Sequence, residues 1–134
     1  MKKALLVILI ILVITTSLAL CACTGYKSSF KATMLVCTNL SKEASMNFDS
    51  ITGTKVFNMN WKDDTEGTIE YTGTLDKGKL TVYYDGGDGK QELFTLKEGE
   101  TVSEKAGKIQ KGKVYIIVET DGKCEGGKLS FNLV

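Results

Sequence analysis

From Phe30 to the end of the chain, apolar and polar residues alternate in short runs, and no window keeps the 3.6-residue spacing of an amphipathic helix. The runs are rich in β-branched and aromatic residues and are separated by Gly, Asn and Asp, which is the pattern of strands joined by tight turns. The chain contains 14 Gly and no Pro among its 134 residues, so Gly, Asn, Asp and Ser must make the turns. The alternation therefore predicts an all-β domain.

The predicted strands are short. They cover residues 31–38, 44–50, 55–61, 68–75, 79–85, 91–96, 113–120 and 128–134. The first is apolar on both faces and is therefore expected in the interior of a sheet. Turns are expected at 50–53 and 76–78 and a loop at 121–127, and the two strands around 76–78 form the clearest predicted hairpin. Residues 100–109 favour a strand only around Thr101, followed by a loop.

One predicted strand, 68–75, has a fully polar face. Its apolar positions point inward, and its outward positions are Thr68, Glu70, Thr72 and Thr74. A half-solvated antiparallel strand has this signature.

Seven or eight short strands in this length predict a two-sheet antiparallel β-sandwich over residues 30–134. The closing sequence runs Lys-Gly-Lys-Val-Tyr-Ile-Ile-Val, a Gly-containing loop and Gly-Gly-Lys-Leu-Ser-Phe-Asn-Leu. It resembles the last hairpin of many small extracellular jelly-roll modules. The resemblance implies a jelly-roll-like arrangement and no particular activity, because such modules host unrelated functions.

A basic and apolar leader precedes this domain. Lys2 and Lys3 are followed by an uninterrupted apolar run from Leu5 to Ile14, the length of a secretory signal core. The alternative is a membrane-spanning helix over 4–20, which is at the short limit for a bilayer and has no basic cluster after it. We expect an export signal over residues 1–22.

The leader ends in Leu20-Cys21-Ala22-Cys23, which resembles the lipobox of bacterial lipoproteins. The resemblance implies that Cys23 receives a diacylglycerol, that cleavage follows Ala22, and that Cys23 becomes the new N-terminus. Cys21 stands where a small residue is more usual and would leave with the leader. Two acyl chains hold a protein stably at a membrane, whereas one holds it only marginally.

The lipobox resemblance also implies a location. The domain is expected at the extracytoplasmic face of the cell membrane, with residues 23–29 as lipidated cysteine and short tether. In a host with two membranes, the family's sorting rule favours the outer one, because Thr24 is not acidic. The alternatives are ordinary secretion with a chance cysteine, and a Cys-x-Cys metal or redox pair in a leader that is never removed.

Two cysteines, Cys37 and Cys124, remain once Cys21 and Cys23 are assigned. An even pair in an exported domain predicts a disulfide, provided that the first and last strands pair. The alternative is two free thiols, with Cys37 buried and Cys124 exposed.

Two loops are rich in acidic residues. Asp63, Asp64 and Glu66 share one, and Asp85 and Asp88 share the other. Such loops at the rim of a sandwich can hold Ca²⁺, but neither has a dedicated calcium-loop spacing. Turns in a chain without Pro also require Asp and Gly, so these residues are weak metal candidates.

Tyr83 and Tyr115 are the candidate ligand-binding residues. Strand parity places Trp61, Tyr71 and Tyr84 among core residues and leaves these two tyrosines outside. Exposed rings can stack on sugars or contact a protein. Packing between neighbouring strands would explain them equally well.

The composition limits the kinds of catalytic and metal-binding site that the chain can form. The chain has no His, and all 17 of its basic residues are Lys. Catalytic triads and most zinc sites are thereby excluded, and a Lys- or carboxylate-only enzyme is the remaining catalytic alternative. Loss of the leader would remove Lys2 and Lys3 and take the net charge from +1 to −1, which argues against nucleic-acid binding.

The sequence therefore predicts a lipid-anchored envelope lipoprotein with a non-catalytic β-sandwich that binds a partner or has a structural role. No cofactor is expected. The expected partners besides the membrane are a cell-wall glycan or another envelope protein, and carbohydrate is favoured over calcium as ligand.

Overall fold

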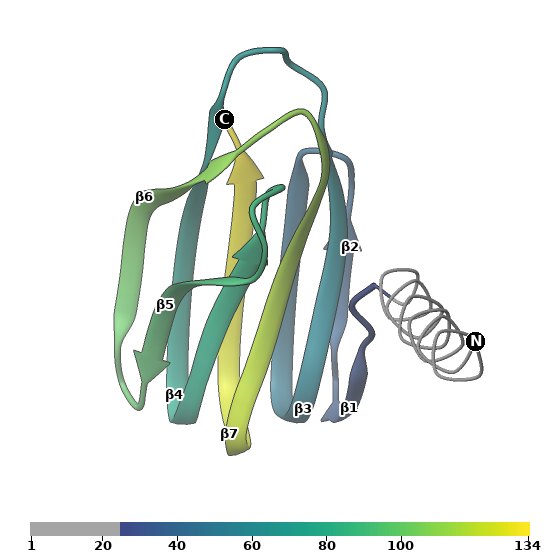
Figure 1. Ribbon diagram of the computed structural model, residues 1–134. Coiled ribbons are helices and arrows are strands. Elements are labelled where there is room, and N and C mark those ends of the chain that lie inside the picture. The colour runs from purple at the N-terminus through teal and green to yellow at the C-terminus, as the bar shows by residue number, and fades with distance from the viewer. Residues whose placement is uncertain (1–24) are drawn as a thin grey trace, which may run out of the picture.

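The computed structural model describes residues 25–134, which form seven antiparallel strands (Figure 1). They are β1 (Ser29–Thr33), β2 (Val36–Asn39), β3 (Glu43–Trp61), β4 (Gly67–Asp85), β5 (Gln91–Lys97), β6 (Thr101–Ile109) and β7 (Gly112–Leu133). This part of the chain contains no helix that is long and apolar enough to cross a membrane. The predicted leader and Cys23 lie outside the described residues.

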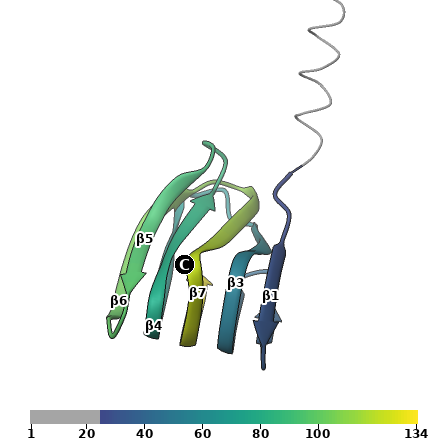
Figure 2. The ribbon, with the colours of Figure 1, turned by 90° about the horizontal axis from the view of Figure 1, so that it is seen from below.

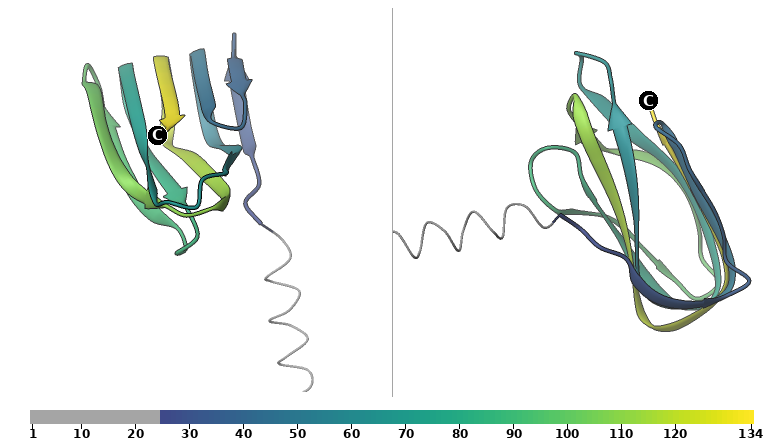
Figure 3. Two further views of the ribbon diagram at one scale, coloured as in Figure 1. Left: turned by 90° about the horizontal axis from the view of Figure 1, so that it is seen from above. Right: turned by 90° about the vertical axis from the view of Figure 1, so that its right-hand side faces the viewer.

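Three long strands form the centre of the sheet. β3 and β4 have 19 residues each and β7 has 22, and the strand order is β1-β3-β7-β4-β5, with β2 also on β3 and β6 also on β4. The pairing registers shift between Ile51 and Thr54 and between Lys77 and Lys79. All three long strands turn back at this level, so the sheet folds over on itself (Figure 3).

The folded sheet makes two layers. Layer A contains β2, β6 and the halves of the long strands at 43–51, 67–77 and 124–133. Layer B contains β5 and the other halves, at 54–61, 79–85 and 112–121. β1 pairs with residues 50–54 of β3, at the bend between the layers. β1 and β3 lie at one side of the molecule and β5 and β6 at the other (Figure 2). The predicted antiparallel β-sandwich is confirmed.

The core lies between these layers and is built by the period-2 alternation of the strands. Phe57 of layer B and Phe131 of layer A are both fully buried, with ring centroids 6.2 Å apart. Tyr71 of layer A stacks on Phe94 of layer B at 4.4 Å. Aromatic contacts thus join the two halves of the sheet across the core.

Glycine makes the fold-over of the sheet possible. Gly53 in β3 and Gly78 in β4 have φ values of +122° and +100°, which side-chain-bearing residues rarely adopt. A Cβ atom on Gly78 would lie 2.8 Å from the carbonyl oxygen of Lys123 and 2.9 Å from Sγ of Cys124. The bend of β4 therefore packs directly against the bend of β7.

These bends correct three sequence predictions. Residues 76–78 do not close a hairpin, 50–53 do not end a strand, and 121–127 are not a loop, because β4, β3 and β7 each continue through them. Their Gly and Asp content is typical of a turn. However, β3 and β4 each stay paired with β7 before and after the bend. A bend with a register shift and a hairpin use the same residues.

Two further predictions about strands are wrong. The expected interior strand at 31–38 is two exposed edge strands, β1 and β2, separated where Met34 adopts a φ of +54°. The segment 100–109, expected to be mostly loop, is one continuous strand, β6, which pairs with β4 from Gly67 to Thr74.

Candidate functional site

A row of hydroxyl side chains crosses the outer face of layer A. Ser45 of β3 pairs with Ser130 of β7, which pairs with Thr72 of β4, which pairs with Ser103 of β6. Residues paired across antiparallel strands point to the same side of a sheet. Four adjacent strands therefore present a hydroxyl at the same level.

A second row lies beside the first. It consists of Asn47, Lys128, Thr74 and Thr101, from the same four strands. The residues between the rows point into the core, as Met46 and Leu129 show by their burial. Alternation within each strand thus separates an apolar inner face from a polar outer face.

These rows line a groove of about 510 Å³, bordered by Val36 on β2 and Val102 on β6. None of the side-chain hydrogen bonds found within residues 25–134 uses a groove hydroxyl. The hydroxyls can therefore donate to and accept from a ligand.

The chemistry of the groove is that of a binding surface. Its polar side chains are hydroxyls, the Asn47 amide and the Lys128 ammonium, and its lining residues in the described domain include no aromatic ring and no carboxylate. Hydroxyls and amides recognise polar groups by hydrogen bonding. The groove, as far as residues 25–134 line it, lacks a nucleophile with an activating base beside it.

The two predicted ligand-binding tyrosines are not in this groove. Tyr83 and Tyr115 are half-buried on the outer face of layer B. The ammonium of Lys90 lies 4.4 Å from the Tyr83 ring centroid and 2.8 Å from a carboxylate oxygen of Glu119. The ring of Tyr115 meets that of Tyr26 at 5.1 Å in an edge-to-face arrangement. Both rings are thus engaged by the protein's own side chains.

Tyr26 fastens the start of the described chain to layer B. Its phenol donates a 2.8 Å hydrogen bond to a carboxylate oxygen of Asp85, and Ser28 Oγ accepts a 2.8 Å bond from the backbone N–H of Val56. Burial, and then the bond to Asp85, raise the pKa of Tyr26. We call these contacts of Tyr26 and Ser28 the latch. The sequence alone predicts only a short tether here. An aromatic residue within a polar tether, Tyr26, was the one indication that this segment could pack against the domain.

Alternation points Val56 and Ile117 outward on layer B, away from the main core, yet they are only 6% and 2% exposed. The segment that carries the latch runs along this face, with Ser28 bonded to Val56. The outer face of layer B is thus partly covered by the chain that precedes β1.

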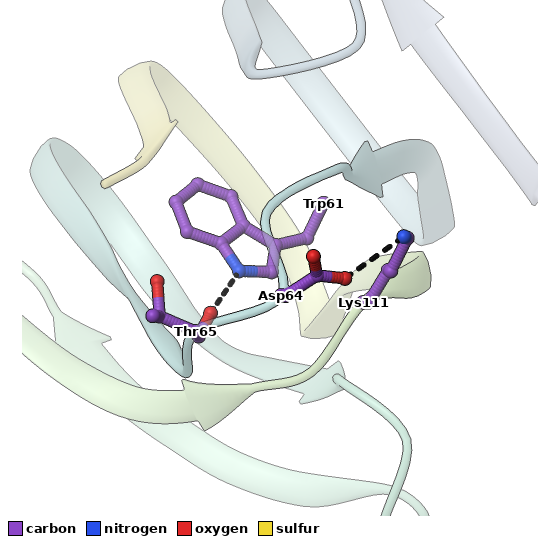
Figure 4. A network of polar contacts seen from close by, with 4 residues as sticks. All are labelled: Trp61, Asp64, Thr65 and Lys111. Atoms are coloured by element: carbon purple, nitrogen blue, oxygen red, sulfur yellow. Dashed lines mark hydrogen bonds and ion pairs between the residues drawn. The ribbon is translucent and has the colours of Figure 1, made fainter.

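The acidic candidates take part in local contacts. Asp64 pairs with Lys111 at 2.9 Å, beside the indole N–H of Trp61, which donates to the carbonyl oxygen of Thr65 at 2.9 Å (Figure 4). These contacts tie the loop after β3 to the start of β7.

Asp85 accepts from Tyr26 and from the N–H groups of Gly87 and Gly89. Within residues 25–134, no three His, Cys, Asp or Glu side chains form a group that could hold a metal ion. The acidic loop residues, Asp63, Asp64, Glu66, Asp85 and Asp88, are therefore not brought together into a metal site.

The predicted disulfide is not formed, because Cys37 and Cys124 are both free thiols. Their burial is also the reverse of the predicted one, since Cys37 is exposed on the edge strand β2 and Cys124 is buried in the bend of β7. Cys124 Sγ donates to the carbonyl oxygen of Lys79 at 3.2 Å, and burial raises the pKa of this thiol. The strands that carry the two cysteines do not pair with each other.

No protein-family model and no curated protein matches the chain. Several solved structures are distantly similar. A variant of a family 29 carbohydrate-binding module complexed with mannohexaose is 16% identical over 82% of this chain and 79% of its own, with a TM-score of 0.42. The pre-peptidase C-terminal domain of collagenase from Bacillus anthracis is 13% identical over 72% of this chain and 91% of its own, with a TM-score of 0.45. At this level of similarity, neither ligand nor function transfers to the chain.

Proposed function

We propose that this chain is an envelope lipoprotein, anchored through a diacylated Cys23, whose jelly-roll-like β-sandwich binds a polar polymer in the groove of layer A. The favoured ligand is a carbohydrate, such as a cell-wall glycan, and binding is non-catalytic. The observation that carries the proposal is the row of four hydroxyls across four strands, with a mixed row of hydroxyl, amide and ammonium groups beside it. The hydroxyls of both rows have no hydrogen-bond partner within residues 25–134.

A groove of this chemistry suits an extended ligand rich in hydroxyl or amide groups. The rows run across the strands and end at the edge strands, so a chain-like ligand could enter from either side. Each hydrogen bond exchanges with water and contributes only about 0.5–1.5 kcal/mol, so several are needed for useful affinity. The rows offer several in register.

The anchor is tested by substituting Cys23→Ala in the full chain, with Cys21→Ala as the matched control. We expect Cys23→Ala to abolish the mass of the acyl groups and to release the protein from the membrane fraction, since Cys23 would carry the lipid. Cys21→Ala should leave both unchanged, because that residue departs with the leader. Membrane retention of Cys23→Ala without a change in acyl mass would refute lipidation.

The groove is tested by substituting Thr72→Val, which removes a hydroxyl at nearly constant volume. The purified, detergent-solubilised protein is applied to a glycan array and to isolated peptidoglycan. We expect binding to one class of glycan, and we expect Thr72→Val to weaken it by about 2- to 10-fold, the effect of one hydrogen bond.

The matched control is Thr81→Val, on the same strand but on the outer face of layer B. It should leave glycan binding unchanged. Absence of binding to every glycan, or equal losses in the two variants, would contradict the assignment of the groove.

A further inference from the structure

The short strand β2 forms one edge of layer A, and one of its two long sides has no partner strand in the part of the chain that the structure describes. We propose that this side pairs with β2 of a second copy of the chain, so that the layer A sheets of two copies join into one continuous sheet. The pairing goes beyond the binding function given above and does not depend on the ligand.

The backbone of β2 directs hydrogen-bonding groups toward this open side. The backbone N–H of Leu40 donates to the carbonyl oxygen of Glu43 on β3. Backbone groups alternate in direction along a strand, so those of Thr38 also face β3, and those of Cys37 and Asn39 face away from it. All four residues of β2 are exposed. Two N–H groups and two carbonyl groups are therefore directed at a further strand.

The side chains of this edge do not protect it against pairing. Residues 35–40 include no charged residue and no Pro, which are the usual means of keeping an edge strand unpaired. Five large hydrophobic side chains are exposed among residues 25–134, and three of them lie on this edge: Met34, Val36 and Leu40. The edge is thus uncharged, exposed and partly apolar, which are the features of an edge that accepts another strand.

The order of residues along β2 matches a second β2 that runs in the opposite direction. Val36 and Leu40 lie two residues before and two residues after Thr38, in the same outward phase. Antiparallel pairing about a twofold axis at Thr38 places Val36 opposite Leu40 of the second copy, and the reverse. In this register Cys37 faces Asn39 of the second copy, and each such pair exchanges two backbone hydrogen bonds. A second copy of this strand therefore satisfies both the apolar side chains and the backbone groups.

The size of the contact and the charge of the opposite edge limit the assembly to a reversible pair. A stable interface contains about 20–30 residues a side, whereas this edge offers only residues 35–40. The dimer should therefore depend on local concentration. The edge strand β6, at the other side of the molecule, carries charges that oppose pairing of the same kind, on Glu104, Lys105 and Lys108 (Figure 1). The twofold contact uses both β2 edges, so the assembly ends at two copies.

Pairing would lengthen the groove of layer A. Thr38 pairs with Ser45, so the hydroxyl row continues onto β2 and crosses five strands in each copy. In the dimer the Thr38 residues of the two copies lie side by side, and the two rows become one. At ~4.8 Å per strand, the row grows from about 19 Å to about 43 Å. A polymer in the proposed groove would contact both copies and gain avidity, and this consequence alone rests on the proposed function.

Disulfide cross-linking of the full-length protein tests the pairing. Cys37→Ser removes the exposed thiol of β2, and Thr38→Cys then places one thiol at the twofold axis. Facing residues of a pair without hydrogen bonds have Cα atoms about 4.5 Å apart, which is within the range of a disulfide. The matched control is Ser103→Cys in the same background, since Ser103 is also exposed and ends the hydroxyl row on the opposite edge strand. Dimer is measured by non-reducing electrophoresis after mild oxidation, in membranes and in detergent.

We expect Thr38→Cys to form at least tenfold more disulfide-linked dimer than Ser103→Cys, because only the first thiol meets its own copy. Adding Val36→Glu or Leu40→Lys should lower the yield about tenfold, since each places a charge opposite an apolar side chain. The two together should restore the yield, because opposite charges then face each other across the pair. Within one chain these positions are four residues, or ~13 Å, apart, so an ion pair inside one copy does not explain the recovery.

The pairing and the proposed function fail in different ways. Equal cross-linking of Thr38→Cys and Ser103→Cys would overturn the pairing, and a double variant that does not recover would overturn its register. Circular dichroism checks that each variant is folded, which we expect because the substituted side chains are exposed. Glycan binding is measured on the same preparations. Binding without cross-linking refutes the pairing and leaves the groove, whereas cross-linking without binding to any glycan refutes the groove and leaves the pairing.

Discussion

Individual residues in the bends have roles that differ from those expected for loop residues. Cys124 is the clearest case, since its thiol is buried where β7 turns back and is hydrogen-bonded to the backbone of β4. Cys37 lies on an exposed edge strand. Burial raises the pKa of both thiols, and at Cys37 the nearby charge of Lys55 partly opposes this effect.

This arrangement predicts that Cys37 and Cys124 are both reduced and that their thiols differ in reactivity. Without reductant at pH 8, a small maleimide should modify Cys37 slowly and leave Cys124 unmodified until denaturant is added, because only the thiolate of an accessible cysteine reacts. Mass spectrometry of native and denatured samples checks both steps. A native mass two protons lower, with no labelling in denaturant, would instead establish a disulfide.

For a single strand, the sequence predicts which side chains face outward into the groove. Alternation in 68–75 identifies Thr72 and Thr74 as outward-facing. It does not show that Ser45, Ser103 and Ser130 stand beside Thr72, because strand order and register are set by contacts between residues far apart in sequence. A binding surface made by four strands therefore cannot be predicted from any single segment.

At the scale of elements, the strands that bend without ending were predicted wrongly from the sequence. The apolar alternation on both sides of residues 76–78 correctly identifies two half-strands of β4. The glycine between them, taken by itself, favours a hairpin turn. Deciding between a turn and a bend requires the position of β7, whose own bend fills the space beside Gly78.

Gly78→Ala tests whether this bend needs glycine for space as well as for backbone conformation. The matched control is Gly99→Ala, since Gly99 also has a positive φ, of +75°, but a Cβ atom there would meet no atom of another segment within 4 Å. We expect the control to lose about 1–2 kcal/mol from backbone strain. Gly78→Ala should lose a further 1–3 kcal/mol or so, because the added methyl overpacks the bend.

Urea unfolding of both variants, followed by tryptophan fluorescence of Trp61, measures the difference. Equal losses would mean that the bend of β7 moves aside and that only the backbone conformation of Gly78 matters.

At the scale of the whole molecule, the all-β class and the two-layer sandwich were predictable, because period-2 alternation with frequent Gly needs no knowledge of distant contacts. The partition of strands between layers was not predictable. Six of the predicted segments are halves of β3, β4 and β7, and each half packs in a different layer from its sequence neighbour. The latch was missed for the same reason, since Tyr26 and Asp85 are 59 residues apart.

The passage of β3, β4 and β7 through both layers has a consequence for how the domain comes apart. Each long strand supplies core side chains to both layers, so neither layer can lose its order while the other keeps a complete core. Local opening in proteins follows units that can separate as a whole, and here no such boundary lies between the layers. The domain should therefore resist partial opening, and with it cleavage by proteases that attack transiently exposed segments.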